Sequence, residues 1–154
     1  MPKASVKRLI ECKKNDLINL VLDIEKYPQF VPFCFDAKVY ENNNEGDLIK
    51  IIADLTIGKG LFKDTYKSDV VFNKKKDSIF VKNIEGPLNH LSNNWTFIDK
   101  KNGITEVTFD INFEIKNKFL NTVMEASFKF GLEKIADAFQ KRSDELFGNS
   151  KNKI

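Results

Sequence analysis

The chain has 154 residues, of which 42% are hydrophobic and 14 are Phe, so it is long and apolar enough to bury the core of one domain. Its 25 Lys and Arg residues against 22 Asp and Glu residues give a formal net charge of only +3, which argues against a DNA-binding protein with a large basic surface. No stretch approaches the roughly 18 apolar residues of a membrane span, and Met1 to Ser5 lack the apolar run of a signal peptide, so we expect a soluble, cytoplasmic protein.

The first quarter of the chain predicts a strand followed by two short helical segments. Residues 5–12 alternate between apolar and polar side chains, which indicates a strand. Asn15 is placed to cap a helix that ends before Pro28, because the residue preceding a proline is pushed out of the helical region. The prolines Pro28 and Pro32, with aromatic residues around them, predict a tight turn or a single helical turn.

The middle of the chain predicts a meander of six strands joined by polar or glycine-containing turns. The strands are expected at residues 37–42, 47–57, 61–73, 78–84, 88–99 and 104–116. The last of these alternates most clearly, with Val107, Phe109, Ile111 and Phe113 on one face. Strands with one apolar and one polar face are typical of an antiparallel sheet that is covered on one side.

The last regular element is a long helix expected at residues 118–147, with apolar residues spaced alternately by three and four. Asn117 is placed to cap its start and Gly148 to end it. Such a helix spans about 45 Å and needs a sheet to cover its apolar face. The sequence therefore predicts an α+β fold in which a curved seven-stranded antiparallel sheet wraps a C-terminal helix. Residues 1–148 are expected to form one domain, and residues 149–154 a flexible tail.

A curved sheet and a straight helix do not match along their whole length, so their packing leaves a gap that large side chains or a ligand must fill. The concave face is predicted to be mostly Ile, Val, Leu and Phe, so a ligand there would be apolar. We expect the turns near residues 58–60 and 86–87 to lie beside the start of the long helix. Apolar residues and lysines gather at this end: Leu61, Phe62, Pro87, Leu88, Phe119, Leu120, Lys59, Lys63 and Lys118. They either form a portal that contacts an anionic membrane or fold inward and plug the core.

Three motifs carry a resemblance to a known family. They are Tyr27-Pro28-x-Phe30-x-Pro32-x-Cys34, Phe62-x-Asp64-x-Tyr66-x-Ser68, and Gly86-Pro87 followed by Leu91, Trp95 and Phe97. Together they resemble the coenzyme-Q-binding protein family, which belongs to the START-like (Bet v 1-like, polyketide-cyclase-like) superfamily of helix-grip proteins. The resemblance runs from about Val6 to Phe147, with the elements in family order.

The resemblance implies a function as well as a fold. It implies a hydrophobic cavity that binds ubiquinone or a similar polyisoprenoid lipid, as a carrier for respiratory electron transport at the inner membrane. Bacterial members of the same subfamily are also known as ribosome-association toxins, which bind the large ribosomal subunit and block subunit joining. A third reading is a cyclase- or dehydrase-like enzyme acting on a polyketide. We expect a lipid-binding protein that is not an enzyme and needs no cofactor beyond its ligand.

The cavity wall is predicted from the concave faces of the strands and helix. Within it, Asp64, Tyr66 and Ser68 share one face of a strand. They either hydrogen-bond a quinone head group, satisfy one another, or supply an acid–base group for ring closure. The predicted wall residues are Phe33, Ile51, Ala53, Leu55, Phe62, Asp64, Tyr66, Leu91, Trp95, Phe109, Ile111, Phe113, Met124, Phe128 and Leu132.

Other reactive residues carry weaker signals. His90 is the single histidine; it is expected to point away from Leu91 and Trp95, and no Cys or His stands at metal-ligand spacing from it. Cys12 and Cys34 are expected to be free thiols. The sequence contains no nucleophile–base pair, phosphate-binding loop or nucleotide fingerprint. The lysine-rich turns near residues 74–76 and 100–101 are either a solvated end or the surface that ribosomal RNA would contact.

Overall fold

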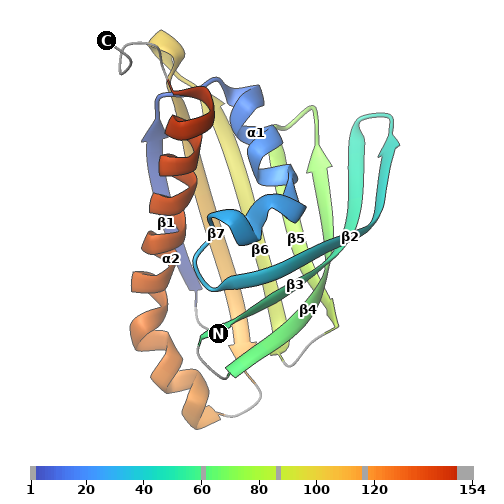
Figure 1. The fold of residues 1–154 in the computed structure, drawn as a ribbon, viewed down its shortest axis with the longest axis vertical. Coiled ribbons are helices and arrows are strands. Elements are labelled where there is room, and N and C mark those ends of the chain that lie inside the picture. Colours follow the sequence, from blue (N-terminus) through green and yellow to red (C-terminus); the bar gives the residue numbers. More distant parts are fainter. Residues whose placement is uncertain (1–2, 60–61, 86–87, 116–117, 149–154) are drawn as a thin grey trace.

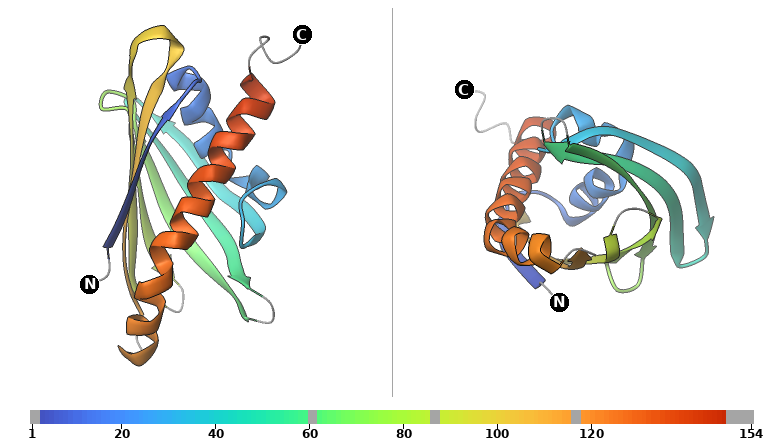
Figure 2. Two further views of the ribbon diagram at one scale, coloured as in Figure 1. Left: turned by 90° about the vertical axis from the view of Figure 1, so that its left-hand side faces the viewer. Right: turned by 90° about the horizontal axis from the view of Figure 1, so that it is seen from below.

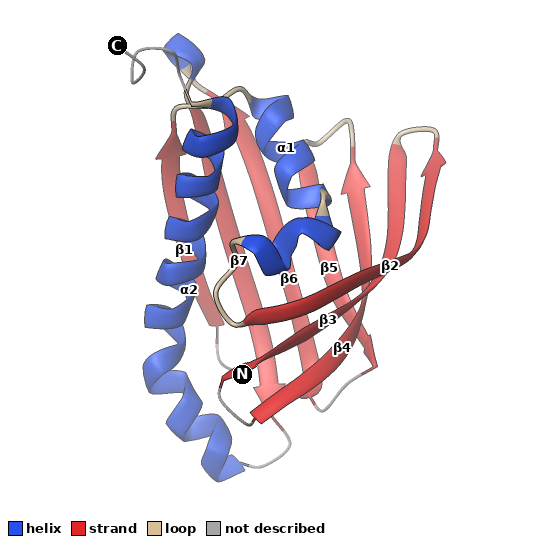
Figure 3. Ribbon diagram, in the orientation of Figure 1, coloured by secondary structure: helices blue, strands red, loops and turns tan. Residues whose placement is uncertain are grey.

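The computed structural model of the protein describes residues 3–59, 62–85, 88–115 and 118–148 (Figure 1). For residues 59, 62, 85, 88–89, 115 and 118–130 it describes the backbone alone. Within these ranges the chain forms one sheet whose helices, apart from a short 3-10 turn at one end, lie on the same side of it (Figure 3).

The sheet has seven strands, and every neighbouring pair is antiparallel. Its order is β1-β7-β6-β5-β4-β3-β2, so the first strand closes onto the last and the others follow the chain as a meander. This confirms the predicted fold class. The strands are β1 (Lys3–Ile10), β2 (Cys34–Glu45), β3 (Leu48–Lys59), β4 (Phe62–Asn73), β5 (Ser78–Glu85), β6 (Leu88–Asp99) and β7 (Thr105–Ile115).

The helices fill the curve of the sheet. The first, α1 (Lys14–Leu22), continues into a 3-10 helix, η1 (Ile24–Gln29), which contains Pro28. The long helix α2 (Lys118–Phe147) has the predicted bounds. A short 3-10 turn, η2 (Lys101–Gly103), links β6 to β7. Figure 2 shows α1 inside the curve of the sheet and α2 along its open side.

Two local predictions were wrong. Asn15 lies inside α1, where Lys13 is the N-cap residue and makes no side-chain capping bond. The turn expected at 42–46 is much shorter, because the asparagines continue β2 as far as the Glu45–Leu48 pair. Gly46, with a φ of +65°, then permits a two-residue hairpin turn. β2 also carries two register irregularities, and such bulges strengthen the twist of a sheet edge.

The packed core lies under α1. Leu17, Ile18, Leu20 and Val21 of α1 are buried against the concave face of the sheet. Lys14 Nζ fixes this helix to the turn end of the sheet, lying 2.9 Å from Asp77 Oδ2 and 3.3 Å from Asp99 Oδ2. Because α1 is buried in this way, it forms one wall of the space between the sheet and the helices.

The three polar turns lie together at one end of the sheet, as predicted. The β2–β3 and β4–β5 turns and η2 lie at one end, and the start of α2 lies at the other (Figure 1). Most side chains of the proposed portal lie outside the described residues: Lys59, Leu61, Phe62, Pro87, Leu88, Lys118, Phe119 and Leu120. Lys63 is described; it is exposed, and its Nζ lies 4.0 Å from the centre of the Phe35 ring. The portal therefore stays a prediction.

Candidate functional site

A cavity of about 200 Å³ lies between the concave face of the sheet and the segment that runs from α1 into β2. Its described wall contains no charged side chain. Strands β3 to β7 contribute Ala53, Leu55, Ile57, Tyr66, Ser68, Val70, Ile79, Val81, Leu91, Asn93, Trp95, Phe109 and Ile111. The helices, the η1–β2 connection and the first residue of β2 contribute Val21, Ile24, Tyr27, Val31, Pro32, Phe33, Cys34, Ile135 and Phe139.

The strand register brings these side chains together. Ala53 pairs with Ser68 and Leu55 with Tyr66 across β3 and β4. On the other side of the sheet, Trp95 pairs with Phe109 across β6 and β7. Because paired residues point to the same face, the alternation along each strand becomes one continuous wall.

An aromatic cluster holds α2 against η1, the segment that covers the cavity on the side opposite the sheet. The ring of Phe139 on α2 lies edge-on to Tyr27, Phe30 and Trp95, with centroids 5.4, 5.1 and 5.2 Å away. The Tyr27 hydroxyl donates to the carbonyl oxygen of Val21, and burial raises the pKa of this phenol. The Tyr27-Pro28-x-Phe30 motif therefore ties η1 to α1 and α2, and it holds the cavity cover in place.

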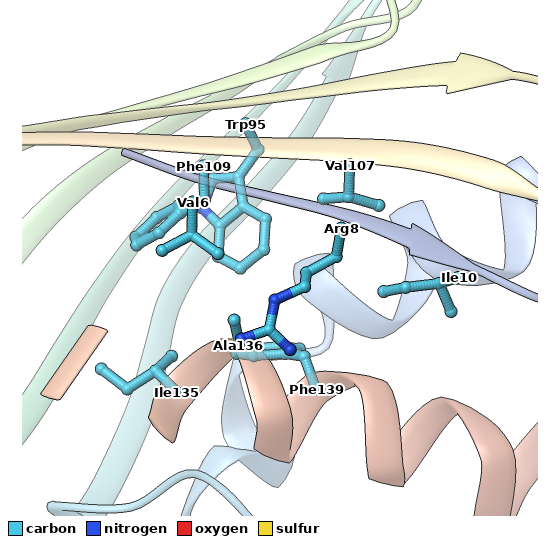
Figure 4. Close-up of a pocket in the computed structure, with 9 residues that line it drawn as sticks. All are labelled: Val6, Arg8, Ile10, Trp95, Val107, Phe109, Ile135, Ala136 and Phe139. Carbon is cyan, nitrogen blue, oxygen red and sulfur yellow. The ribbon is translucent and has the colours of Figure 1, made fainter. Parts of the chain in front are cut away.

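A second void, of about 30 Å³, lies between β1, β7 and α2 (Figure 4). It is too small for a lipid, because a void of roughly 10–15 Å³ is needed for a single water molecule. Arg8 reaches across it, and its Nη1 lies 2.6 Å from Asp137 Oδ1. Trp95, Phe109 and Phe139 separate this void from the large cavity, since they line both.

The predicted wall residues fall into four groups. Those that line the cavity are Phe33, Ala53, Leu55, Tyr66, Leu91, Trp95, Phe109 and Ile111. Ile51, Phe113 and Leu132 are buried outside its lining, and Asp64 is exposed. The side chains of Phe62, Met124 and Phe128 lie outside the described residues. The role of each as a ligand contact stays a prediction.

The polar groups of the wall differ from the predicted set. Tyr66 and Ser68 line the cavity, but the exposed Asp64 does not. Burial, with the nearby Asp64 carboxylate, raises the pKa of Tyr66. Burial also raises the pKa of the Cys34 thiol to about 11, and this thiol donates to the Asp36 carbonyl oxygen at 3.7 Å. Both side chains therefore present neutral, protonated groups to the cavity near pH 7.

Sequence reasoning missed Asn93. This residue occupies the position between Leu91 and Trp95 on the concave face of β6, and its carboxamide oxygen is buried with no hydrogen-bond partner among the described residues. The signal was present in the sequence: in the series 91, 93, 95, 97, only position 93 is polar. A polar residue on an otherwise apolar face marks a candidate ligand contact.

The described residues hold no cluster of His, Cys, Asp and Glu suited to a metal ion. His90 lies outside the cavity lining, and its Nε2 is 3.3 Å from Ser92 Oγ. Within the same described residues, no helix combines the length and apolar character that a membrane crossing requires.

Comparison with known proteins gives the chain relatives along nearly its whole length. A sequence model described as polyketide cyclase/dehydrase and lipid transport matches residues 13–140. The ribosome association toxin RatA of Rickettsia prowazekii is 32% identical over 90% of this chain and 94% of its own. The mitochondrial coenzyme Q-binding protein COQ10 of Dictyostelium discoideum is 31% identical over 88% of this chain and 66% of its own.

Solved structures share the fold at lower identity. A START superfamily protein from Mycobacterium smegmatis matches with a TM-score of 0.82 and 17% identity, over 95% of this chain and 99% of that one. The ZhuI aromatase/cyclase of a Streptomyces species matches with a TM-score of 0.80 and 11% identity, over 92% and 93% of the two chains. Both share the curved sheet and C-terminal helix described above.

Proposed function

The chain belongs to the polyketide cyclase/dehydrase and lipid transport family, and from this premise we propose that its cavity binds and carries a neutral polyisoprenoid lipid such as ubiquinone. The observation that carries the proposal is the 200 Å³ cavity with no charged side chain in its described wall. An isolated charge is costly to bury without a partner, so this wall disfavours fatty acids and phosphorylated lipids. The likeness to a coenzyme Q-binding protein supports a quinone among the neutral lipids.

The size of the cavity supports a ring held inside and a tail held elsewhere. An apolar cavity of about 150 Å³ accommodates benzene, and drug-sized ligands occupy pockets of about 300–1,000 Å³. The 200 Å³ space therefore suits one substituted ring and is too small for a long isoprenoid tail. The tail would leave the cavity, and transient contact with a membrane would serve to load the lipid.

The same wall supports binding without turnover. A general acid or base must lie within hydrogen-bond reach of the reacting atoms, at about 2.6–3.2 Å. Asp64 is exposed and outside the lining, and the raised pKa of Tyr66 keeps its phenol protonated. The likeness to an aromatase/cyclase at 11% identity extends to the fold alone. We therefore propose a carrier rather than a cyclase.

Organic extraction of the freshly purified protein, followed by mass spectrometry, tests the proposal. We expect a polyisoprenoid quinone at near-stoichiometric amount, either directly or after incubation with liposomes that contain ubiquinone. An extract without quinone after both treatments would contradict the carrier function.

A second candidate, association with the large ribosomal subunit, is favoured by the likeness to RatA and by exposed lysines at one end of the sheet. Lys75, Lys76 and Lys101 are exposed, whereas Lys74 Nζ is held 2.7 Å from Asn44 Oδ1 and 2.9 Å from the Gly46 carbonyl oxygen. The Lys74 ammonium group thus braces two turns. Lys75 Nζ lies 3.3 Å from Asp47 Oδ2 in an exposed ion pair, so RNA phosphates would compete with this carboxylate for Lys75 and would meet Lys76 and Lys101 directly.

Sedimentation with large ribosomal subunits at several salt concentrations tests this candidate. Charge reversal of Lys75, Lys76 and Lys101 to Glu should weaken binding and reduce its salt dependence. The matched control reverses three other exposed lysines to Glu, namely Lys7 of β1, Lys82 of β5 and Lys141 of α2, so that both variants change the net charge equally. Equal loss in both variants would show that net charge, and not this end of the sheet, determines binding.

A further inference from the structure

A short connection, residues 30–33, closes the cavity between η1 and β2. Val31, Pro32 and Phe33 line the cavity, and each of these residues is half-buried rather than buried. Figure 3 shows the connection in tan on the helix side of the sheet, with no described helix or strand in front of it. A single segment of chain therefore separates the cavity from solvent at this place.

Phe33 has a backbone conformation that is unusual for its residue type. Its φ is +70°, and Asp77 and Asn102 are the other non-glycine residues with a positive φ in the described part of the chain. Asp and Asn adopt this left-handed conformation more readily, because their short polar side chains can hydrogen-bond locally, whereas a bulky side chain is strained there. Strained residues cluster at ligand clamps and moving segments, so Phe33 is the candidate for a moving part of the wall.

The two ends of the connection are held differently. At its start, the Val31 amide donates to the Tyr27 carbonyl oxygen at 2.8 Å, which fixes the chain to η1. At its end, the Phe33 carbonyl oxygen accepts a hydrogen bond of 2.9 Å from the amide of Gly58 in β3. The strained conformation of Phe33 is therefore tied to the sheet through this bond.

Opening the bond between Phe33 and Gly58 would let the backbone at Phe33 return to the extended region. The strain released is similar in size to the net contribution of one backbone hydrogen bond. Because Phe33 is only half-buried, less apolar burial is lost on opening than for a core Phe. The closed and open forms are therefore close in free energy, and the open form is a minor but accessible state.

We propose that Phe33 is the gate of the cavity: its ring closes the entrance, and rotation of the backbone at Phe33 lets an apolar ligand pass. This inference rests on the proposed function for the identity of the ligand, and it assigns the route by which the lipid enters and its tail leaves. The elements on both sides stay in place, because Tyr27 packs on Phe139 and Cys34 pairs with Ile57. The gate therefore needs no movement of the sheet or of α2.

A gate and a wall contact have different kinetic signatures. Removing a gate lowers the barrier in both directions, so association and dissociation rates rise together and affinity changes little. Removing a wall contact weakens the complex, and such losses usually appear in the dissociation rate. The two roles of Phe33 can therefore be separated by rates.

Acrylamide quenching of fluorescence tests the gate without any lipid. Trp95 is the single tryptophan, lines the cavity and is 8% exposed, so a small neutral quencher must enter the cavity to reach it freely. Because minor open states are populated at about 0.1–10%, removal of the ring should raise the quenching rate constant at least several-fold. The variants are Phe33→Ala and Phe33→Gly; glycine adopts a positive φ without strain, so the second variant should fold even where the first does not.

Phe35→Ala is the matched control. Phe35 lies two residues further along the chain, is 48% exposed and does not line the cavity. Its removal should leave the quenching of Trp95 unchanged. An equal rise in Phe35→Ala would assign the effect to general loosening of this segment and overturn the gate.

Stopped-flow fluorescence with a short-chain ubiquinone then measures the rates of binding. In the Phe33 variants, association and dissociation should both accelerate about tenfold or more, with a nearly constant ratio. Leu91→Ala, at a wall position on β6, should raise the dissociation rate alone. The same pattern in the Phe33 variants would make Phe33 an ordinary wall contact and overturn the gate.

The outcomes separate the two proposals. Unchanged quenching of Trp95 in both Phe33 variants overturns the gate, whatever the lipid measurements give, and leaves the carrier function standing. Raised quenching in these variants, with no binding of ubiquinone by any form of the protein, supports the gate and contradicts ubiquinone as the ligand.

Discussion

Two regions of the same concave face are filled in opposite ways. We define the packed region by Ile10, Phe97, Val107 and Phe139, which lie near a void of about 30 Å³. We define the hollow region by Ala53, Ser68, Val81 and Asn93, which line the 200 Å³ cavity. Both regions alternate in the same way along antiparallel strands, so the difference does not arise from the hydrophobic pattern.

Side-chain size accounts for the difference. At the boundary of the packed region, Trp95 pairs with Phe109, and their ring centroids are 4.2 Å apart. In the hollow region, Ala53 pairs with Ser68, so two small side chains lie side by side in the cavity wall. Protein interiors are normally close-packed, so a run of small residues opposite α1 and η1 is a departure that leaves room for a ligand.

Phe139→Ala should have the largest effect, because it would remove the boundary between the packed and hollow regions. Phe139 lines both voids and contacts Tyr27, Phe30 and Trp95, so its removal would merge the two regions. Replacing a buried Phe with Ala typically costs about 3–5 kcal/mol of unfolding free energy. Equilibrium urea denaturation measures this loss. Phe80→Ala, at a position that is 46% exposed, is the control and should change stability by less than about 0.5 kcal/mol.

Ala53→Trp should fill the hollow region and leave the packed region unchanged. Ala53 is 1% exposed and lines the cavity, so the indole would occupy the space assigned to the ring of the lipid. We expect lipid binding to be lost and stability to fall by about 1–3 kcal/mol, the usual cost of overpacking. Lipid extraction and urea denaturation measure the two effects. Lys82→Trp, on the outer face of β5, should keep lipid binding; retention of lipid by Ala53→Trp would place the ligand elsewhere.

Cys34 reports on the hollow region through its reactivity. Burial raises its pKa to about 11 from an ordinary 9.0, so at pH 8 the folded protein should react with iodoacetamide roughly ten- to hundredfold more slowly than a free thiol. The folded-state pKa exceeds the unfolded one, so the stabilising contribution of the protonated thiol is present below pH 9. It is lost as the pH rises from about 9 to 11. Mass spectrometry after timed alkylation measures the rate, and denatured protein supplies the reference; equal rates would mean that the thiol is not buried.

The fold was largely predictable from the sequence, because strand and helix periods are local properties. The bounds of α2 follow from its three- and four-residue spacing, and the meander follows from alternation. The β2–β3 turn was not predictable in the same way. Its position depends on how far Asn42 to Asn44 pair with β3, which is decided between two strands and not within one.

The site was predictable in part. Alternation shows which face of the sheet a residue occupies, but it does not show whether its position along the strand is next to the cavity. Ile51 and Phe113 are on the predicted concave face, yet they are buried outside the cavity. Asp64 shares the parity of Tyr66, but it is exposed near the end of β4. Asn93 was not predicted, because a single polar residue between Leu91 and Trp95 does not follow the hydrophobic pattern that identifies the wall. The small residues that hollow the sheet become informative only once the register sets Ala53 beside Ser68.

The ion pair between Arg8 and Asp137 should give the smallest effect, although it closes the packed region. Its nitrogen–oxygen distance is 2.6 Å, but the Asp137 side chain is 66% exposed, so water and salt screen the attraction. Exposed ion pairs contribute about 0.2–1 kcal/mol, and we expect Asp137→Asn to lower the unfolding free energy by this amount at low salt. The difference should shrink in 1 M NaCl, where the Debye length is about 3 Å. A loss of more than about 2 kcal/mol that persists in high salt would mean that the packed region depends on this pair rather than on its aromatic contacts.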